Sequence, residues 1–293
     1  MTFPLRYLLA FGALLLATTT LAQEPKVLVQ MQKQSRFTAQ LLLIDKKFPD
    51  RQFISYSLQN YRLMNYDPRR ERYAMVVSQG SGQLHDTRVT SVDFPEEKVA
   101  ALLENKILIK HLKHTGEEWE MVAAESGRLE EQDVTVSPEL PKELLEQRKS
   151  EGYTITSISS NPVYWVLVFT KTHNGSDPIY FTSRKFPVQD VKTKAEAGYE
   201  ITAMHYNKHQ QQWLIGMQRP QEGKDIRLWA GDQLPEGWIE ERWLEGYQIT
   251  YLYHDLRVKQ LIQNSNTRLF RPFQLGFPHQ QTDSQYLIKL YPN

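Results

Sequence analysis

The stretch that decides the fold runs from Leu140 to Trp165 and reads LPKELLEQRKSEGYTITSISSNPVYW. It begins with an apolar residue and a proline, continues through a charged segment, and then alternates through Tyr153-Thr154-Ile155-Thr156. The first part is typical of a short helix and the second of a β-strand. Both parts recur elsewhere in the chain, so this stretch is one copy of an internal repeat.

The apolar-proline pair recurs at spacings of 46, 46, 46 and 48 residues. The five pairs are Phe48-Pro49, Phe94-Pro95, Leu140-Pro141, Phe186-Pro187 and Leu234-Pro235. An apolar residue follows thirteen positions after the first residue of each pair, at Tyr61, Ile107, Tyr153, Tyr199 and Tyr247. A further aromatic column stands at Tyr73, Trp119, Trp165 and Trp213. Proline pairs that recurred by chance would not keep these additional columns, so the repeat is real.

Each unit is expected to start with a short helix. Proline suits the first helical position, because its φ is preset and no hydrogen-bond donor is lost there. One position inside the segment is apolar in every unit, at Phe53, Val99, Leu145, Val191 and Ile239, which predicts a narrow buried stripe. A residue suited to a left-handed conformation then ends the helix, at Asn60, Gly152, Gly198 and Gly246. Lys106 departs from this column.

Three strands should follow each helix. The Tyr-x-Ile-Thr stretches alternate as strands do, but the next apolar residue falls three positions on rather than two, which predicts a β-bulge. The aromatic column marks a second strand, and stretches such as Pro178 to Thr182 and Ile226 to Ala230 mark a third. Each unit is therefore predicted as helix, strand, strand, strand, in an α+β repeat.

The two ends of the mature chain carry complementary half-units. Val27-Leu28-Val29 stands where a strand of the aromatic column belongs, and Phe277-Pro278 opens a short unit that contains Tyr286-Leu287-Ile288. Joining the halves would leave no unpaired sheet edge, so we expect about six units closed into a propeller-like ring. The alternative is an open solenoid capped by the fragments. The predicted domain covers residues 23–293, with units near 48–93, 94–139, 140–185, 186–233 and 234–276 and a split unit of 26–47 plus 277–293.

Residues 1–22 are predicted to form a cleavable signal peptide. Arg6 supplies a positive charge, Tyr7 to Ala17 are mostly apolar, and small residues precede a cut between Ala22 and Gln23. The alternative is a membrane anchor, but the apolar run is shorter than the roughly 20 residues that span a bilayer. The protein is therefore expected to be periplasmic or secreted, without membrane insertion after cleavage.

Charge and composition narrow the classes of partner. Without Arg6, the mature chain has 34 basic and 34 acidic residues, a balance that argues against nucleic acid as a partner. The chain has no cysteine, which excludes disulfides, thiolate metal sites and a cysteine nucleophile. We expect no cofactor and no metal.

The segments Leu234 to Ile239, Gly246 to Thr250, and Gly152 to Thr156 followed by Trp165 carry a family resemblance. They resemble the uncharacterised repeat domain that follows the kinase domain in plant casein-kinase-like kinases and that also occurs in bacterial proteins. The resemblance implies a repeat architecture and carries over no catalytic residue. The kinase motifs themselves are absent from this sequence.

Candidate catalytic and metal sites are weak in this sequence. His205, His209 and His254-Asp255 could suggest metal ligands, but they fall at strand ends and turns, where solvent-exposed histidines are common. No nucleophile-elbow motif occurs, and paired glutamates such as Glu96-Glu97 are typical of solvated helix starts. Asn174-Gly175-Ser176 is either a glycosylation acceptor or a turn.

Aromatic residues outside the repeat columns are the candidates for ligand binding. Recurring aromatic positions are what core packing requires, whereas departures from the pattern can serve a surface. The candidate ligand-binding residues are Tyr164, Trp229, Trp238, Trp243, Tyr251 and Tyr253.

Three functions remain open at this stage. The leading hypothesis is an exported, non-enzymatic binding or scaffold protein that presents a face to a protein or peptide partner. The second is a hydrolase with its site in the central depression, and the third is a carbohydrate-binding module.

Overall fold

The computed structural model describes residues 26–33, 39–45, 47–69, 72–81, 83–126, 131–171, 177–220 and 224–254, and the backbone of 285–289. The predicted signal peptide with Ala22 and Gln23, the possible glycosylation acceptor at Asn174, and most of the predicted half-unit 277–293 lie outside these residues.

Each of the five proline pairs is followed by a helix, as predicted. The helices are α1 (Asp50–Leu58), α2 (Glu96–Glu104), α3 (Lys142–Ser150), α4 (Val188–Glu196) and α5 (Glu236–Leu244). The proline is not the first helical residue but the residue before it, with φ between −80° and −86°. The predicted stripe is confirmed, because the apolar column residue of every helix is buried, from Phe53 in α1 to Ile239 in α5.

The residue that ends the helix turn adopts a positive φ in all five units. The φ of Gly152, Gly198 and Gly246 lies between 82° and 86°, and that of Asn60 is 63°. Lys106, which departs from the column in sequence, keeps the same conformation with a φ of 56°. The repeat geometry therefore overrides the preference of a lysine, at a cost of about 1 kcal/mol.

The strands form five antiparallel sheets. Each has an outer strand that precedes a helix, an inner strand that follows it, and a middle strand between the two. The outer strands are β2 (Ala39–Asp45), β5 (Gln83–Ser91), β8 (Glu131–Ser137), β11 (Asp177–Ser183) and β14 (Ile226–Gly231). The inner strands are β3 (Tyr61–Arg69), β6 (Leu108–His114), β9 (Tyr153–Ser160), β12 (Glu200–Asn207) and β15 (Tyr247–His254). The middle strands are β4 (Arg72–Gln79), β7 (Trp119–Ser126), β10 (Trp165–Lys171), β13 (Gln212–Arg219) and β1 (Val27–Lys33).

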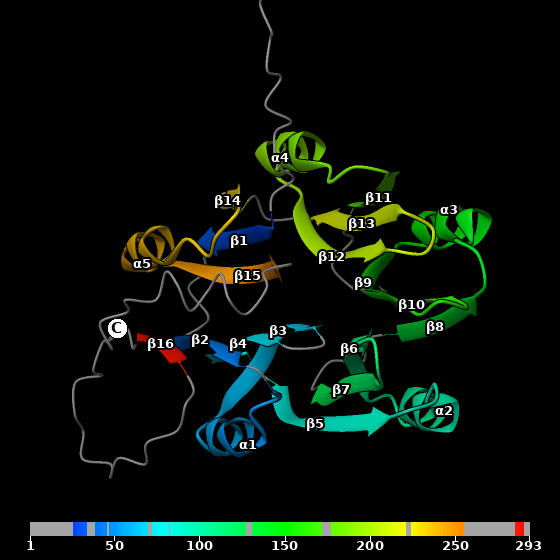
Figure 1. The fold of residues 1–293 in the computed structure, drawn as a ribbon, viewed down its shortest axis with the longest axis horizontal. Coiled ribbons are helices and arrows are strands. Elements are labelled where there is room, and N and C mark those ends of the chain that lie inside the picture. The colour runs from blue at the N-terminus through cyan, green and yellow to red at the C-terminus, as the bar shows by residue number, and fades with distance from the viewer. Residues whose placement is uncertain are drawn as a thin grey trace, which may run out of the picture.

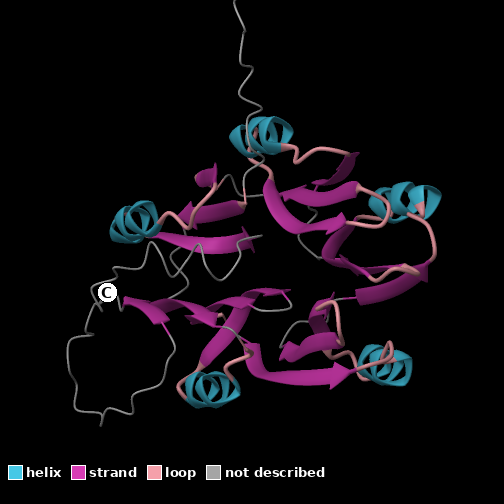
Figure 2. Ribbon diagram, in the orientation of Figure 1, coloured by secondary structure: helices cyan, strands magenta, loops and turns pink. Residues whose placement is uncertain are grey.

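Each sheet crosses a boundary of the repeat as the sequence defines it. The third strand of one unit pairs with the middle strand of the next unit, as β5 does with β7 and β8 with β10. We number the sheets from first (β2, β4, β3) to fifth (β14, β1, β15). Figures 1 and 2 show the inner strands nearest the centre of the molecule and the five helices at its rim.

The ends of the described chain differ from the predicted composite unit. The predicted assignment of Val27–Val29 to a strand of the aromatic column is confirmed in position, because β1 is the middle strand of the fifth sheet. A separate sixth sheet does not form among the described residues. Instead, β16 (Gln285–Lys289) pairs with β2 as a fourth strand of the first sheet. In the sequence, the fifth unit carries Lys259 in the aromatic column, and this residue lies outside the described ranges. The middle strand of the fifth sheet is the apolar β1.

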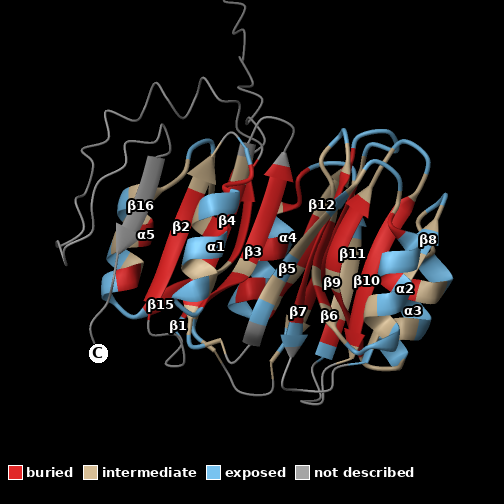
Figure 3. Ribbon diagram, turned by 90° about the horizontal axis from the view of Figure 1, so that it is seen from below, coloured by how far each residue is buried: buried red, intermediate tan, exposed pale blue. Residues whose placement is uncertain are grey.

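The core consists of apolar layers between neighbouring sheets. One cluster packs Val122 of β7 against the first sheet, and another packs Val166 and Val168 of β10 against the second. The layer that contains Val27 of the fifth sheet and Trp243 of α5 also contains Leu42 and Val76 of the first sheet. Figure 3 shows these buried strands side by side, with exposed helix surfaces outside them. None of the helices in the described part of the chain combines the length and apolar character needed to cross a bilayer.

Candidate binding pocket where the inner strands meet

The predicted bulge is present in all five inner strands. In each one, a single residue is skipped in the pairing with the middle strand, and the two flanking residues pair with consecutive partners. The skipped residues are Met64, Lys110, Thr156, Thr202 and Thr250. A bulge turns a side chain out of the regular alternation of the sheet and leaves the extra residue unpaired.

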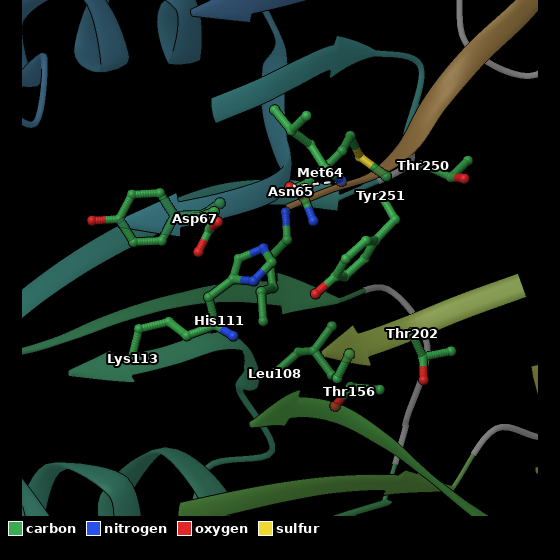
Figure 4. A pocket seen from close by; sticks show the side chains of 14 residues that line it. Met64, Asn65, Asp67, Leu108, His111, Lys113, Thr156, Thr202, Thr250 and Tyr251 are labelled. Carbon is green, nitrogen blue, oxygen red and sulfur yellow. Dashed lines mark hydrogen bonds between the residues drawn. The ribbon is translucent and has the colours of Figure 1, made fainter. Parts of the chain in front are cut away.

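The five bulge residues all line one pocket, with a volume of about 200 Å³. Figure 4 shows this pocket with its side chains converging from the five inner strands. The volume equals that of about six or seven water molecules, so the pocket suits a small ligand or one end of a larger one. Its wall combines apolar side chains such as Leu108 with charged ones such as Asp67 and Lys113.

The threonine hydroxyls of the bulges face their own sheets. Thr156 Oγ1 lies 2.8 Å from Thr170 Oγ1 on the adjacent middle strand, and Thr250 Oγ1 accepts a hydrogen bond from Gln30 Nε2 at 3.0 Å. Thr202 is likewise the bulge residue of its strand, but the neighbouring residue on its middle strand is Gly216, which has no side chain to bond to it. The Thr202 hydroxyl has no hydrogen-bond partner among the described residues. Two of the three hydroxyls are therefore committed to holding the bulge in place.

The inner strand β6 supplies the basic wall of the pocket. Lys110 Nζ donates to the carbonyl oxygen of Leu63 and forms an ion pair with Asp86 Oδ1 at 3.1 Å. Burial lowers the pKa of Lys110, while the nearby carboxylate of Asp86 acts in the opposite direction. Lys113 Nζ donates to the carbonyl oxygen of Ile158 at 2.8 Å. Both lysines are thus held by neighbouring strands.

His111 lies between the two lysines in sequence and is buried. Burial, and then the positive charges of Lys110 and Lys113, hold the pKa of His111 well below 6.5. The imidazole is therefore neutral at neutral pH, with one nitrogen that donates and one that accepts. Its Nε2 has no hydrogen-bond partner among the described residues. A buried polar atom of this kind calls for a ligand or a water as its partner.

The opposite side of the pocket is held by strand-to-strand hydrogen bonds. Asn65 Oδ1 accepts the N–H of Leu252 at 3.3 Å, and Asp67 Oδ2 accepts the N–H of His254 at 3.0 Å. These contacts join the inner strands of the first and fifth sheets. The carboxylate of Asp67 therefore has a structural role in the wall.

The aromatic candidates from the sequence separate into two groups. Trp243 and Tyr253 are buried in the core, and Tyr251 is buried at the pocket wall, where its hydroxyl donates to the Met204 carbonyl oxygen at 3.3 Å. Tyr164 stacks on Trp119 with ring centroids 5.9 Å apart. Trp229 and Trp238 pack, half-buried, against a core cluster. Among the described residues, these aromatics form no exposed row of the kind that a glycan would need, and Tyr251 alone of the six lines the pocket.

The histidines considered as metal ligands have other contacts. His205 Nε2 lies 2.8 Å from Ser160 Oγ, and His254 is buried on β15 beside Asp67. His209 stands in the turn before β13, and Asp255 lies outside the described residues. The described ranges contain no group of three or more histidine or acidic residues placed to hold a metal ion.

Sequence reasoning did not identify Asn65, Asp67, Lys110, His111 and Lys113 as site residues. A usable signal was present, because the bulge column reads Thr in three units and Lys110 in the second. The residues predicted as site candidates on departures from the repeat were all aromatic. That is why Tyr251 was found and β6 was missed.

Comparison with known proteins identifies a family but no function. No curated protein and no solved structure matches the chain. A family model described as a domain of unknown function (DUF7477) matches residues 103–268, which is more than half of the 293 residues and includes four of the five inner strands. The chain therefore belongs to the DUF7477 family.

Proposed function

We propose that the protein is a non-catalytic binding module, in which five sheets close into a ring and a small ligand, or one end of a larger one, occupies the central pocket. The observation that carries the proposal is that one bulge residue from every inner strand lines the same pocket. A site shared by all repeats is the place where a ring-shaped repeat protein offers a preorganised ligand surface.

Ring closure is supported by a contact that repeats between inner strands. Ser157 Oγ and Ser159 Oγ of β9 accept the N–H groups of Leu112 and His114 of β6, at 3.0 and 2.8 Å. Asn65 and Asp67 of β3 make the equivalent pair of contacts with β15 of the fifth sheet. The first and fifth sheets are thus joined in the way that the second and third sheets are. The ring that we propose has five sheets, where the sequence predicted six.

Binding is favoured over catalysis because two of the three threonine hydroxyls and the one carboxylate in the pocket lining are engaged in structure. The hydroxyls of Thr156 and Thr250 bond to middle strands, and the carboxylate of Asp67 accepts a main-chain N–H. A general base must reach the proton that it removes, and a nucleophile needs such a base beside it. The hydrolase hypothesis is therefore the second candidate.

The predicted export and the predicted partner form part of the same proposal. A signal peptide ending at Ala22 would place the mature module in the periplasm or outside the cell, where a protein, a peptide or a small molecule could supply the ligand. The resemblance to the repeat domain of casein-kinase-like kinases adds an architecture and no activity.

A fragment screen by ligand-observed NMR on the mature chain tests the proposal. Met64→Trp adds bulk at the pocket wall, and Val163→Trp places the same indole at a position that is 68% exposed. We expect fragments that bind the native protein and the Val163 variant and that are lost from the Met64 variant. Fragments that bind all three proteins equally, or a screen without hits, would contradict a ligand site in this pocket. Turnover of a bound fragment would favour the hydrolase.

A further inference from the structure

The strand β6 is the inner strand that gives the pocket a basic wall. At the bulge and at the positions one and three residues beyond it, β6 carries Lys110, His111 and Lys113. The corresponding positions of β9 carry Thr156, Ser157 and Ser159. No other inner strand carries a lysine at any of these three positions, so the basic set on β6 is a local departure from the repeat. Because this departure lies at a pocket wall, it can serve ligand recognition as well as the strand contacts of Lys110 and Lys113.

The charges at this wall favour a negative group. Two lysines and one aspartate line the pocket. The aspartate already accepts a main-chain N–H on the opposite side, and Lys110 also forms the ion pair with the buried Asp86. Burial is the main cause of the lowered pKa of His111, and the positive charges of Lys110 and Lys113 lower it further. Two cations that lower the pKa of a histidine beside them would also stabilise an anion placed there.

The buried imidazole adds a directional group. His111 is 9% exposed, and its Nε2 has no partner among the described residues. Figure 4 shows the ring projecting from β6 toward β3, where Asn65 and Asp67 lie. A neutral imidazole can donate one hydrogen bond to a ligand oxygen. The remaining wall includes Leu108 and Met64, which suit an apolar body attached to the negative group.

On this basis we propose that the pocket binds a carboxylate with a short apolar body, held at the β6 wall by His111 and Lys113. The inference rests on the proposed function, because it names the ligand class of the same pocket. The carboxylate could belong to a free short-chain acid or to the C-terminus of a peptide, since the two present the same group. The volume of about 200 Å³ admits a short acid or the last residue of a chain.

The test compares butyrate with butyramide, which has nearly the same shape without the charge. Binding to the mature chain is followed by NMR titration, with the imidazole signals of His111 assigned by a His111→Gln variant. We expect saturable binding of butyrate that shifts the His111 signals. Butyramide should bind at least about 10-fold more weakly than butyrate. Lys113→Met should remove this preference, and Lys113→Arg should retain it. Lys98→Met makes the same charge change on the exposed face of α2 and should have no effect.

The outcomes separate the two proposals. Equal binding of butyrate and butyramide, with shifts at His111, would overturn the carboxylate inference and leave pocket binding intact. Butyrate binding that leaves His111 unshifted, or that is unchanged in Lys113→Met, would place the ligand elsewhere and also overturn the inference. Binding of neither compound would overturn it as well, while hits in the fragment screen would still support the pocket.

The source of the carboxylate is tested with a peptide pair. The peptide Gly-Gly-Gly-Val is compared with the same peptide that ends in an amide. Binding of the free acid alone would support recognition of a chain terminus. Binding of butyrate but of neither peptide would support a free acid, and in both cases the carboxylate inference stands.

Discussion

The side-chain amide of Gln40 makes two hydrogen bonds to the main chain of Ile249, which lies 209 positions later in the sequence. Its Oε1 accepts the N–H of Ile249 at 2.7 Å, and its Nε2 donates to the carbonyl oxygen of Ile249 at 2.9 Å. Gln132 makes the same pair of contacts with Ile109, at 2.7 and 3.0 Å. The Gln40 contact joins the first and fifth sheets, and the Gln132 contact joins the third and second sheets in the same way.

Replacing either glutamine should therefore have a comparable cost. Gln40→Ala and Gln132→Ala each leave a main-chain donor and acceptor without the side chain that pairs with them, which costs about 1–3 kcal/mol. Gln40 also accepts the Trp243 Nε1–H at 3.1 Å, so its loss should be at least as large as that of Gln132. Urea unfolding of a protein that comprises residues 23–293 measures both costs. If Gln132→Ala lowers the free energy of unfolding and Gln40→Ala does not, the contact between the first and fifth sheets contributes nothing to stability, which would contradict this prediction.

Lys106→Gly should stabilise the protein by about 0.5–1 kcal/mol. The lysine adopts a φ of 56°, a region that side chains with a Cβ disfavour. The matched change in the opposite sense is Gly152→Ala, at a φ of 82° where an added Cβ meets nothing within 4 Å. Any destabilisation there reflects the backbone conformation alone. Thermal unfolding should show a higher Tm for Lys106→Gly and a lower one for Gly152→Ala, and the reverse order would contradict this account.

Gly216→Ala should destabilise the protein by about 1–3 kcal/mol. An added Cβ would lie 3.2 Å from Ile155 Cβ and 3.2 Å from Thr202 Oγ1, between two neighbouring inner strands that have little room to move. Gly237→Ala is the control, because an added Cβ there meets nothing and alanine is the better helix former in α5. Chemical unfolding should separate the two variants by sign. An unchanged stability for Gly216→Ala would mean that the sheets pack less closely than described.

The free energy of unfolding should fall as the pH rises from about 5 toward 9, through the titration of Glu120. Burial, and then the charge of Asp50, raise the pKa of Glu120 from 4.5 to about 8, outweighing the attraction of Arg88 at 3.0 Å. A group whose pKa is raised on folding stabilises the fold fully below its unfolded value and loses that contribution as the pH passes the folded value.

The variant Glu120→Gln removes this titration and should flatten the pH dependence between 5 and 8. Glu143→Gln, at an exposed position on α3, should leave the slope as it is in the native protein. Urea unfolding at a series of pH values measures both slopes. A native slope that survives in the Glu120 variant would assign the pH dependence to another group.

The repeat made much of the fold predictable from sequence. The apolar-proline pairs mark the five described helices, and the three-residue step after Ile155 and its equivalents marks the bulges, because both follow from local periodicity. The pairing of strands did not follow in the same way. Whether β1 pairs within the fifth sheet or within a sixth depends on which strand edges lie next to it in space. The sequence of Val27–Val29 is compatible with both pairings.

The pocket was less predictable than the fold. Lys110 and His111 are unremarkable within β6 taken alone, since alternating polar residues are common in strands. Their importance arises from the bulge, which brings one residue of each inner strand to a common wall. Trp243 shows the converse, because an aromatic residue outside the repeat columns proved to be part of the core and bonds to Gln40.

Hydrogen exchange of the main-chain amides in β1 tests the closed arrangement most directly. If β1 is the middle strand of the fifth sheet, the amides of Val27–Gln32 should exchange as slowly as those of Trp213–Met217 in β13. Rapid exchange of β1, with β13 still protected, would contradict the proposed closure of the ring and with it the proposed ligand site at its centre.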